Sequence, residues 1–169
     1  TTNDNYIYQK AKSLQNHGMS GRDNIVSFGF VSRMDNLQAS ILNYRIKKLE
    51  KVIKKRRDNA KFYFENIKLR GISLPLEEKF EFNTYHTFVI QYHKRDKLKQ
   101  YLSDRGIGSA IHYPTPIHLQ PASINLGYTL GDLPECEKQS KNILSLPINQ
   151  NLSKIDLKTI CSAINNFEA

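Results

Sequence analysis

The longest apolar pattern in the chain lies between Arg33 and Leu69, where hydrophobic side chains recur at intervals of four and three residues. The stripe consists of Leu42, Ile46, Leu49, Ile53, Ala60, Tyr63 and Ile67, and it is interrupted by Arg56. This spacing places the apolar side chains on one face of an α-helix. The pattern therefore predicts a single helix of about 35 residues, or about 50 Å, from Arg33 to Leu69.

Polar residues mark both ends of this predicted helix. Ser32 and Asp35 have the spacing of a capping box, in which two side chains bond to the exposed amides of the first turn. Gly71 follows basic residues of the last turn and can end a helix in the left-handed conformation. A shorter helix is expected from Asp4 to Leu14, and the polar residues 16–27 predict a loop between the two helices.

Downstream of the long helix the pattern changes from helical to alternating. Residues 85–92 alternate between the two faces of an extended chain, which predicts a strand. A helix is expected from Arg95 to Ser103, and the apolar run 107–111 predicts a second strand. On the first strand, His86 shares a face with apolar side chains, so we expect it to be packed rather than catalytic, whereas His93 is expected to be exposed.

Residues 112–133 are interrupted by prolines and glycines, and they predict a long loop of a length that often carries function. Two helices are expected to close the chain. The first opens near Pro134 and stops before Pro147, and the second starts at Ser153, with Asp156 repeating the capping pattern. Together the elements predict an α/β domain, in which a short, mostly antiparallel sheet packs against the long helix and the two C-terminal helices.

The composition fits one folded domain with a short appendage. A chain of 169 residues with 39% hydrophobic and 10% aromatic residues can bury one core. It has no apolar run of the about 18 residues that a membrane span needs, and its first residues are neither a signal nor a transit sequence, so we expect a cytoplasmic protein without a membrane partner. Cys136 and Cys161 lack metal-ligand spacing and are expected to be buried thiols.

The net charge of +9 allows a nucleic-acid or an anionic-substrate partner. Much of this charge lies on the long predicted helix, away from its apolar stripe, which favours a solvated helix face. A module that binds nucleic acid through this basic helix is one alternative, and salt-dependent affinity would be its signature. No aromatic residues are interleaved with the basic ones to stack on bases, and no known reader motif is present. A dimerisation domain without activity is another alternative.

The proline-rich loop contains the most suggestive polar residues. Its segment IHYPTPIHLQ, residues 111–120, places His112, Tyr113 and His118 on a stiffened chain. Prolines limit the ordering cost of a loop that presents polar groups to a ligand, but a purely structural loop fits the same residues. None of the 5 histidines has the partners of a metal site, so no metal is expected. Glycine-rich nucleotide loops and nucleophile motifs are absent.

Three segments resemble the DegT/DnrJ/EryC1/StrS family of sugar aminotransferases. Residues 29–39, GFVSRMDNLQA, are similar to the family's G-Y-N-S-R-M-D-E-L-Q-A. Residues 106–122 are similar to G-I-x-x-x-x-H-Y-P-x-P-L-H-x-Q-P-A. Residues 131–134 and 144–147 are similar to G-D-x-P and L-S-L-P. The three segments occur in order at the family's separations and extend the resemblance over nearly the whole chain.

The resemblance implies the C-terminal small domain of a fold-type-I transferase that depends on pyridoxal phosphate. Residues 1–28 would end the large cofactor-binding domain and form a dimer loop, residues 29–70 would form the long linking helix and the loop before it, and residues 71–169 would form the small α/β domain. The implied reaction transfers an amino group, expected from glutamate, to a nucleotide-linked keto-sugar in the biosynthesis of lipopolysaccharide, other cell-surface polysaccharides or amino sugars. A sugar dehydratase on the same scaffold is an alternative. The implied partners are the nucleotide-sugar, the amino-acid donor and a second identical subunit.

The resemblance also implies roles for particular residues. The Schiff-base lysine is expected upstream of Thr1, so no catalytic residue is assigned and this chain alone is expected to be inactive. Ser32, Arg33 and the position of Val31 would lie near the cofactor phosphate of the partner subunit. The family commonly has asparagine where this chain has Val31, and the missing amide donor would remove a charge-assisted bond of about 1.5 to 3 kcal/mol. His112, Tyr113 and His118 would face the substrate.

Overall fold

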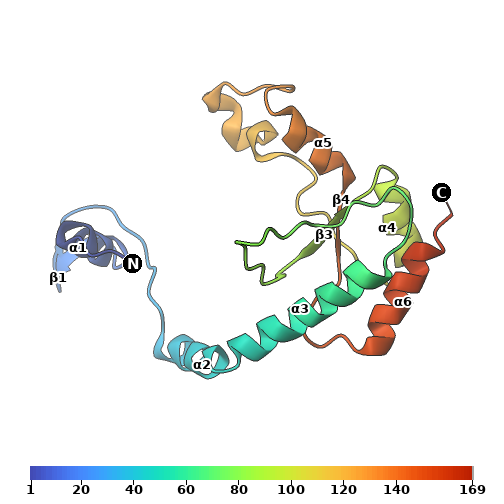
Figure 1. Cartoon of the computed structure of the whole chain (residues 1–169). Helices are drawn as coiled ribbons and strands as arrows, with labels where there is room; N and C mark the ends of the chain where they lie inside the picture. The colour runs from blue at the N-terminus through green and yellow to red at the C-terminus, as the bar shows by residue number, and fades with distance from the viewer. Residues whose placement is uncertain (169) are drawn as a thin grey trace. The chain divides into compact units, whose positions relative to one another are not determined.

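The computed structural model describes residues 1–168. They divide into two compact units, with the boundary between Leu49 and Glu50 (Figure 1). The elements of the first unit are α1 (Asn5–Leu14), β1 (Met19–Gly21), β2 (Asn24–Ile25) and α2 (Asn36–Ile46). The second unit contains α3 (Leu49–Asn66), which begins at the boundary, β3 (Phe88–Gln91), α4 (Arg95–Ser103), η1 (Ile117–Leu119), η2 (Pro121–Leu126), α5 (Pro134–Asn142), β4 (Ile143–Leu146) and α6 (Lys154–Asn165).

The first unit is built around α1, which begins as expected after Asp4. The amide of Ile7 donates to Asp4 Oδ1 over 3.0 Å. Where the sequence predicted a loop, residues 16–27 contain the short antiparallel hairpin of β1 and β2. The chain then returns past Gly18, which has φ 76°, and a Cβ atom there would lie only 1.8 Å from the carbonyl oxygen of Ser27. This close approach requires glycine.

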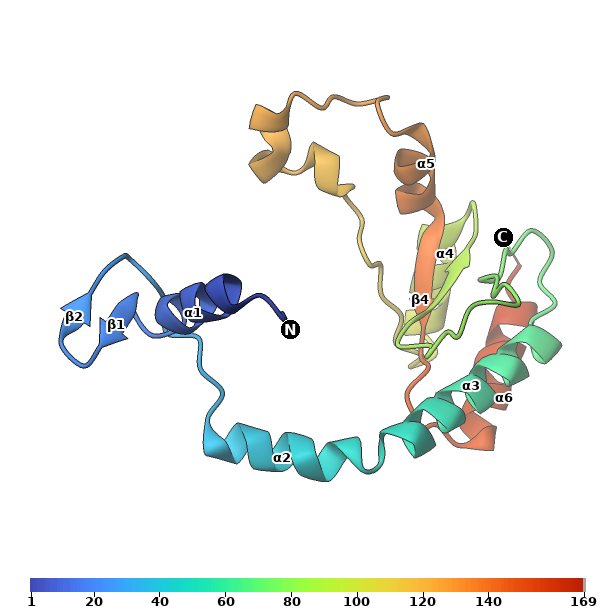
Figure 2. The ribbon, with the colours of Figure 1, turned by 60° about the vertical axis from the view of Figure 1, so that its left-hand side comes forward.

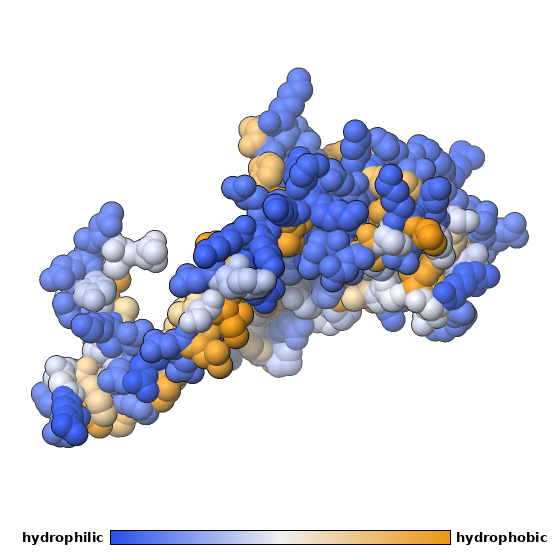
Figure 3. All heavy atoms as spheres, turned by 90° about the horizontal axis from the view of Figure 1, so that it is seen from below, coloured by the Kyte–Doolittle hydropathy of each residue, from blue (hydrophilic) through white to orange (hydrophobic). Residues whose placement is uncertain are grey.

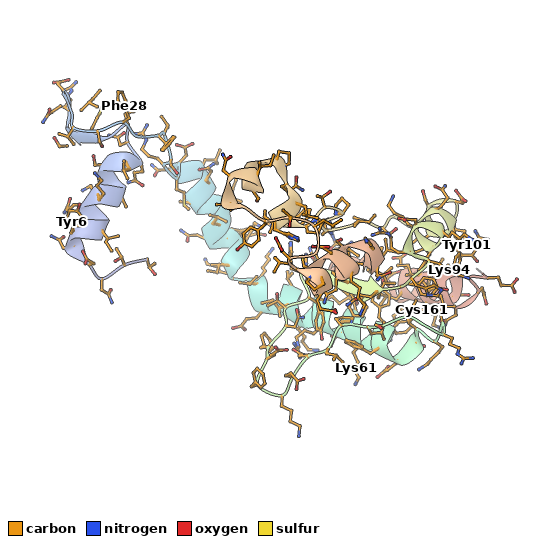
Figure 4. The ribbon with its side chains drawn as sticks, turned by 90° about the horizontal axis from the view of Figure 1, so that it is seen from above. Tyr6, Phe28, Lys61, Lys94, Tyr101 and Cys161 are labelled. Atoms are coloured by element: carbon orange, nitrogen blue, oxygen red, sulfur yellow. The ribbon has the colours of Figure 1, made fainter. Side chains whose placement is uncertain are left out.

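The first unit has no hydrophobic core of its own. Gly18 is its only buried residue, and the structure describes every residue of this unit. Large side chains such as Tyr6, which is 76% exposed, and Phe28 stand out from the chain (Figure 4). On the face shown in Figure 3, orange hydrophobic side chains are exposed between blue hydrophilic ones.

The segment from Arg33 to Leu69 is largely helical, but the prediction of one continuous helix was wrong. α2 and α3 are separate helices, and in the turn between them the amide of Lys48 donates to the carbonyl of Arg45, three residues back. None of the α2 residues, all of which the structure describes, is buried. Helices in proteins are stabilised mainly by packing, and α2 has no buried side chain that would favour its continuation as one helix.

The start of α2 also differs from the prediction. The residue before the helix is Asp35, and its amide donates to Gln38 Oε1 over 3.0 Å. Ser32 lies outside the helix because its amide donates instead to the carbonyl of Gln15, at the end of α1. The capping box therefore begins three residues later than the sequence pattern suggested.

The second unit contains a two-stranded antiparallel sheet, as the sequence predicted. β3 pairs with β4 in the register Phe88 with Leu146 and Gln91 with Ile143. Single bridges extend the sheet on both sides, from Ser73 to Gln91 and from Ala110 to Ser145. The run 107–111 was expected to be a strand, but it contributes only the bridge at Ala110.

Strand β4 was missed from the sequence, which predicted helix up to Pro147. Helix α5 ends at Asn142, and the four residues that follow are extended. An apolar run as short as Ile143–Leu146 does not distinguish a strand from the end of a buried helix. Helix α4 has the predicted limits, and α6 begins after Ser153 with the predicted capping by Asp156.

The core of the second unit lies where α3, α4 and α6 cover the sheet (Figure 2). The ring of Tyr63 on α3 packs 5.0 Å from that of Phe88 on β3, measured between centroids. Its hydroxyl donates to the carbonyl of Pro147 over 2.6 Å, and burial raises the pKa of Tyr63. The ends of α3 and α6 are joined by Asn165, whose amide donates to the carbonyl of Asn66 over 2.8 Å.

Two burial predictions were wrong. His86 is exposed although Phe88 and Ile90 are buried, because Tyr85 has φ 47° and the regular strand starts only at Phe88. The side-chain alternation of the strand therefore does not extend to His86. Cys161 is buried as expected, but Cys136 is exposed in the first turn of α5. Leu133 and Ile143, the apolar residues at helical spacing from Cys136, lie at the two ends of α5 and leave its thiol uncovered.

Candidate functional site

Two of the sequence motifs meet at one edge of the sheet in the second unit. The backbones of Ala110 and Ser145 bond to each other in both directions, with N–O distances of 3.2 and 2.7 Å. His112 follows two residues later, and its Nδ1 lies 2.9 Å from Ser145 Oγ. The GIG–HYP segment (residues 106–114) and the LSLP segment (residues 144–147) are thus held together at β4.

A hollow of about 490 Å³ lies at this strand edge, and we call it the strand-edge hollow. It is lined by Arg56, His86, Thr87, Gly108, Ser109, Ala110, His112 and residues 145–149. Arg56 comes from α3, where it interrupted the apolar stripe of the sequence. Its Nη1 donates to the carbonyls of Tyr85 and His86 over 3.3 and 3.0 Å. A charged residue on an apolar helix face was the sequence signal that this position differs from its neighbours.

A second cavity, of about 780 Å³, lies beneath the proline-rich loop, and we call it the loop cavity. It is lined by His112, Tyr113, Pro114, Thr115, Pro116, Ile117, Gln120, Cys136, Gln139, Ser140 and Ile143. His112 lines both this cavity and the strand-edge hollow. Tyr113 is 73% exposed, so its hydroxyl is available to a ligand. The structure therefore places both His112 and Tyr113 in the lining of one cavity.

His118 lines neither of these cavities and is only 4% exposed. Its Nε2 lies 3.0 Å from Oε1 of Glu137 on α5, and the same oxygen accepts the amide of Gly131 over 2.8 Å. The Gly131 amide, followed by His118, holds the pKa of Glu137 below its usual range. These contacts connect both ends of the loop 118–131 to α5, so in this structure His118 supports the loop that carries His112 and Tyr113.

In the first unit, Val31, Ser32 and Arg33 follow each other on the segment that returns past α1. Val31 forms a bridge with Asn16, its side chain is 63% exposed, and the amide of Ser32 donates to the carbonyl of Gln15. Arg33 contributes to a cavity of about 810 Å³ within this unit. The cationic lining residues are Lys10, Lys12, Arg22 and Arg33, and the part of the lining that the structure describes contains no Asp or Glu. Such a lining suits a phosphate group.

The lysines of this chain do not suit covalent attachment of a carbonyl cofactor. Within residues 1–168 none of them is buried, and most are exposed. A lysine that forms a Schiff base needs a desolvated amine, because hydration keeps the ammonium form stable. Arg33 and the cationic cavity fit the phosphate group of such a cofactor, whereas no lysine among residues 1–168 is buried.

No three His, Cys, Asp or Glu side chains among residues 1–168 are arranged to hold a metal ion. In the described part of the chain, no helix is both long and apolar enough to cross a membrane.

Comparison with known proteins gives one consistent family. The sequence model of the DegT/DnrJ/EryC1/StrS aminotransferase family matches residues 1–165. The chain is 32% identical to the "Pleiotropic regulatory protein" of Geobacillus stearothermophilus, with 98% of this chain and 45% of that protein covered. It is 30% identical to the dTDP-3-amino-3,6-dideoxy-alpha-D-galactopyranose transaminase of Aneurinibacillus thermoaerophilus, covering 99% of this chain and 46% of that enzyme.

A solved structure agrees with the sequence relatives. DesV of S. venezuelae, solved in complex with a ketimine intermediate, superposes with a TM-score of 0.89 at 30% identity. The match covers 98% of this chain and 45% of DesV. The fold expected from the sequence is thereby confirmed. The chain spans slightly less than half the length of each of these three relatives.

Proposed function

Because the chain belongs to the DegT/DnrJ/EryC1/StrS aminotransferase family, we propose that it is the C-terminal part of a pyridoxal-phosphate-dependent sugar aminotransferase. The proposed reaction transfers an amino group from glutamate to a nucleotide-linked keto-sugar. The observation that carries this proposal is the convergence of the GIG–HYP and LSLP segments on one strand edge, where they place His112 beside two cavities. The similarity to a dTDP-amino-sugar transaminase supports the choice of substrate class.

We propose that the first unit binds the phosphate of the cofactor held by the partner subunit of a homodimer. In this assignment residues 1–28 complete the large domain, and Arg33 binds phosphate oxygens through its planar fork of donors. The side chain of Val31 has no hydrogen-bond donor. The neighbouring Ser32 therefore supplies a hydroxyl to the phosphate. The four cations of the cavity in this unit support a phosphate ligand.

We propose that the proline-rich loop binds the nucleotide-sugar. Because Nδ1 of His112 is engaged with Ser145, Nε2 is the ring atom left for a ligand. If the hydroxyl of Ser145 donates to Nδ1, Nε2 carries the hydrogen and donates to a sugar or phosphate oxygen. Tyr113 adds a phenol that can donate or accept. His118, through Glu137, fixes the loop that presents both residues.

Pyridoxal phosphate supplies the carbonyl chemistry of amino transfer when it is bound. This chain contributes binding and orientation, since its lysines are all at least partly exposed over residues 1–168. We therefore propose that the chain alone is inactive and that a lysine of the upstream region holds the cofactor.

The test is to produce this chain together with the region encoded upstream of it and to follow amino transfer from glutamate to a dTDP- or UDP-linked keto-sugar. Transfer should occur, and His112→Ala should lower turnover at least about tenfold, as expected for loss of one positioned polar group. His93→Ala is the matched control, because His93 is an exposed histidine outside both cavities. Equal activity of the two variants would remove His112 from the site. Elimination of water from the sugar without amino transfer would identify a dehydratase instead.

A further inference from the structure

Asn16 and Val31 lie directly opposite each other in the first unit, where they form an isolated antiparallel bridge. Backbone hydrogen bonds flank this pair on both sides, from His17 to Phe30 and from Ser32 to Gln15, each over 3.0 Å. Bonds between the flanking residues define a non-hydrogen-bonded pair, in which the two side chains lie on the same face and Cβ atoms are about 4.5 to 5.5 Å apart. The amide of Asn16 is therefore next to the side chain of Val31.

The backbone of Asn16 is fixed, but its side-chain amide has only a weak partner. The amide nitrogen of the backbone donates to the carbonyl of Ser13, and the carbonyl accepts the amide of Met19, both over 3.0 Å. Within residues 1–168 the side chain makes one hydrogen bond, from Nδ2 to the sulfur of Met19 over 3.7 Å. A thioether is a weak acceptor, so this donor can turn to a better acceptor at little cost.

Asn16 lines the cationic cavity of the first unit together with Arg33, whereas Val31 does not belong to the lining in this fully described unit. The four cations attract an anion into the cavity, but long lysine and arginine side chains lose much rotamer freedom when they bind. A short side chain on a fixed backbone loses less and can orient the ligand. Ser20, another polar residue of the lining, already accepts a bond from Asn24 over 2.9 Å.

We infer that Asn16 is a neutral hydrogen-bond donor of the phosphate site in this cavity. Its Nδ2 exchanges the sulfur of Met19 for a phosphate oxygen, and a bond to a charged acceptor is about twice as strong as a bond between neutral groups. The donor that is missing at Val31 is thereby supplied by the residue opposite. That this phosphate belongs to the cofactor rests on the proposed function, whereas the binding of a phosphate by Asn16 does not.

The first experiment is an NMR titration of this 169-residue chain, labelled with ¹⁵N, with inorganic phosphate at constant ionic strength. We expect saturable shifts of the side-chain amide signals of Asn16 and of the Nε–H signal of Arg33. The side-chain amide of Asn43, which is exposed on α2 outside the cavity, should not shift. A shift at Arg33 without one at Asn16 would overturn the role of Asn16 and leave a phosphate site. No saturable shift at either residue would overturn the phosphate site as well.

Three substitutions separate ligand binding from a structural role. Asn16→Ala should weaken phosphate binding about tenfold, the difference expected for one lost charge-assisted bond. Val31→Asn, added to Asn16→Ala, places an amide on the opposite segment and should restore the affinity to within about threefold. Asn43→Ala is the matched control and should leave binding unchanged. An amide at position 31 would not rescue a purely structural asparagine at position 16. Unchanged affinity in Asn16→Ala, or no rescue by Val31→Asn, would therefore contradict the inference.

If Asn16→Ala fails to fold, the Asn16 signals of the unsubstituted chain decide the question.

A second experiment identifies the source of the phosphate, with this chain produced together with the region encoded upstream of it. Asn16→Ala should raise the dissociation constant of pyridoxamine phosphate, which has no aldehyde to react with lysine, about tenfold and leave that of dTDP unchanged. The opposite result would assign the phosphate to the nucleotide and overturn the cofactor assignment. Amino transfer by the unsubstituted protein tests the proposed function separately, so the two can fail independently.

Discussion

At the scale of single residues, Glu77 shows how one carboxylate can fix an irregular segment. It binds Arg57 of α3 and also accepts the amide of Asn83 over 2.7 Å and the hydroxyl of Tyr85 over 3.2 Å. The hydrogen bond from Arg57, followed by that from the Asn83 amide, lowers the pKa of Glu77 to about 2. These bonds hold residues 77–85 on α3 and bring the chain to the start of β3.

Glu77→Gln should make stability less dependent on pH. The carboxyl is more acidic in the folded chain, with a pKa of about 2, than its ordinary value of 4.5. The stabilisation by Glu77 is therefore fully present above pH 4.5 and is lost as the pH falls toward 2. Thermal unfolding of both proteins should show a lower midpoint for Glu77→Gln at pH 7 and a difference that shrinks with acidification. A difference that stays constant from pH 7 to pH 3 would contradict the assigned pair.

The two cysteines should react at very different rates. Burial raises the pKa of Cys161 to about 11, so only about one molecule in a thousand carries the thiolate at pH 8. Cys136 is exposed. With a thiol reagent such as DTNB, one thiol per chain should react quickly, and Cys136→Ser should abolish this fast phase. Two fast thiols in the folded chain would show that the core around Cys161 opens readily.

The sequence predicted one proline-stiffened loop that presents His112, Tyr113 and His118, and the first two line the loop cavity. It did not separate them from His118, since the partner of His118 is Glu137, 19 residues away. The position of Arg56 in the strand-edge hollow could not be predicted either, because the lining includes β4, a strand that the sequence did not predict. Contacts between distant segments depend on packing that local patterns do not encode.

At the scale of elements, α6 illustrates a helix whose start is specified locally. The amide of Asp156 donates to Ser153 Oγ over 3.1 Å, and the amide of Ser153 donates to Asp156 Oδ2 over 2.8 Å. The helix then contributes Leu157, Ile160, Cys161, Ala163 and Ile164 to the core. Local capping and tertiary packing thus support the same helix, which explains why the sequence predicted its start correctly.

Ser153→Ala should lower the free energy of unfolding by about 1 kcal/mol, the usual effect of losing an N-cap side chain. Urea denaturation followed by circular dichroism measures it. Thr159→Ala, at an exposed position of the same helix, is the control and should change stability little. If the two substitutions had equal effects, the capping bonds would not be a specific source of stability.

Elements whose limits depend on distant contacts were predicted less well. The break between α2 and α3 has no glycine or proline to announce it, and β4 is a short apolar run directly after a helix. Both follow from packing: α2 has no buried residue, and β4 is fixed by pairing with β3. The apolar stripe predicted the buried positions Ala60 and Tyr63 of α3, but it predicted neither the break in the helix nor the exposure of the α2 residues.

At the scale of the whole chain, the two units differ in what stabilises them. The second unit has a core that includes Tyr63, Phe88 and Ile164, whereas within the fully described first unit only Gly18 is buried. Exposed apolar side chains such as those of α2 are expected where a surface packs against another part of a larger assembly. This agrees with the proposal that the first unit completes a large domain and a dimer.

The central claim is that this chain supplies the C-terminal part of a pyridoxal-phosphate enzyme and not the lysine that holds the cofactor. The most direct test is to mix the purified chain with pyridoxal phosphate, reduce with borohydride, and locate cofactor adducts by mass spectrometry alongside the visible absorbance. We expect only scattered, substoichiometric labelling of exposed lysines, and a specific absorbance band only when the upstream region is also present. Stoichiometric attachment to one lysine of this chain, with amino transfer from glutamate, would contradict the account.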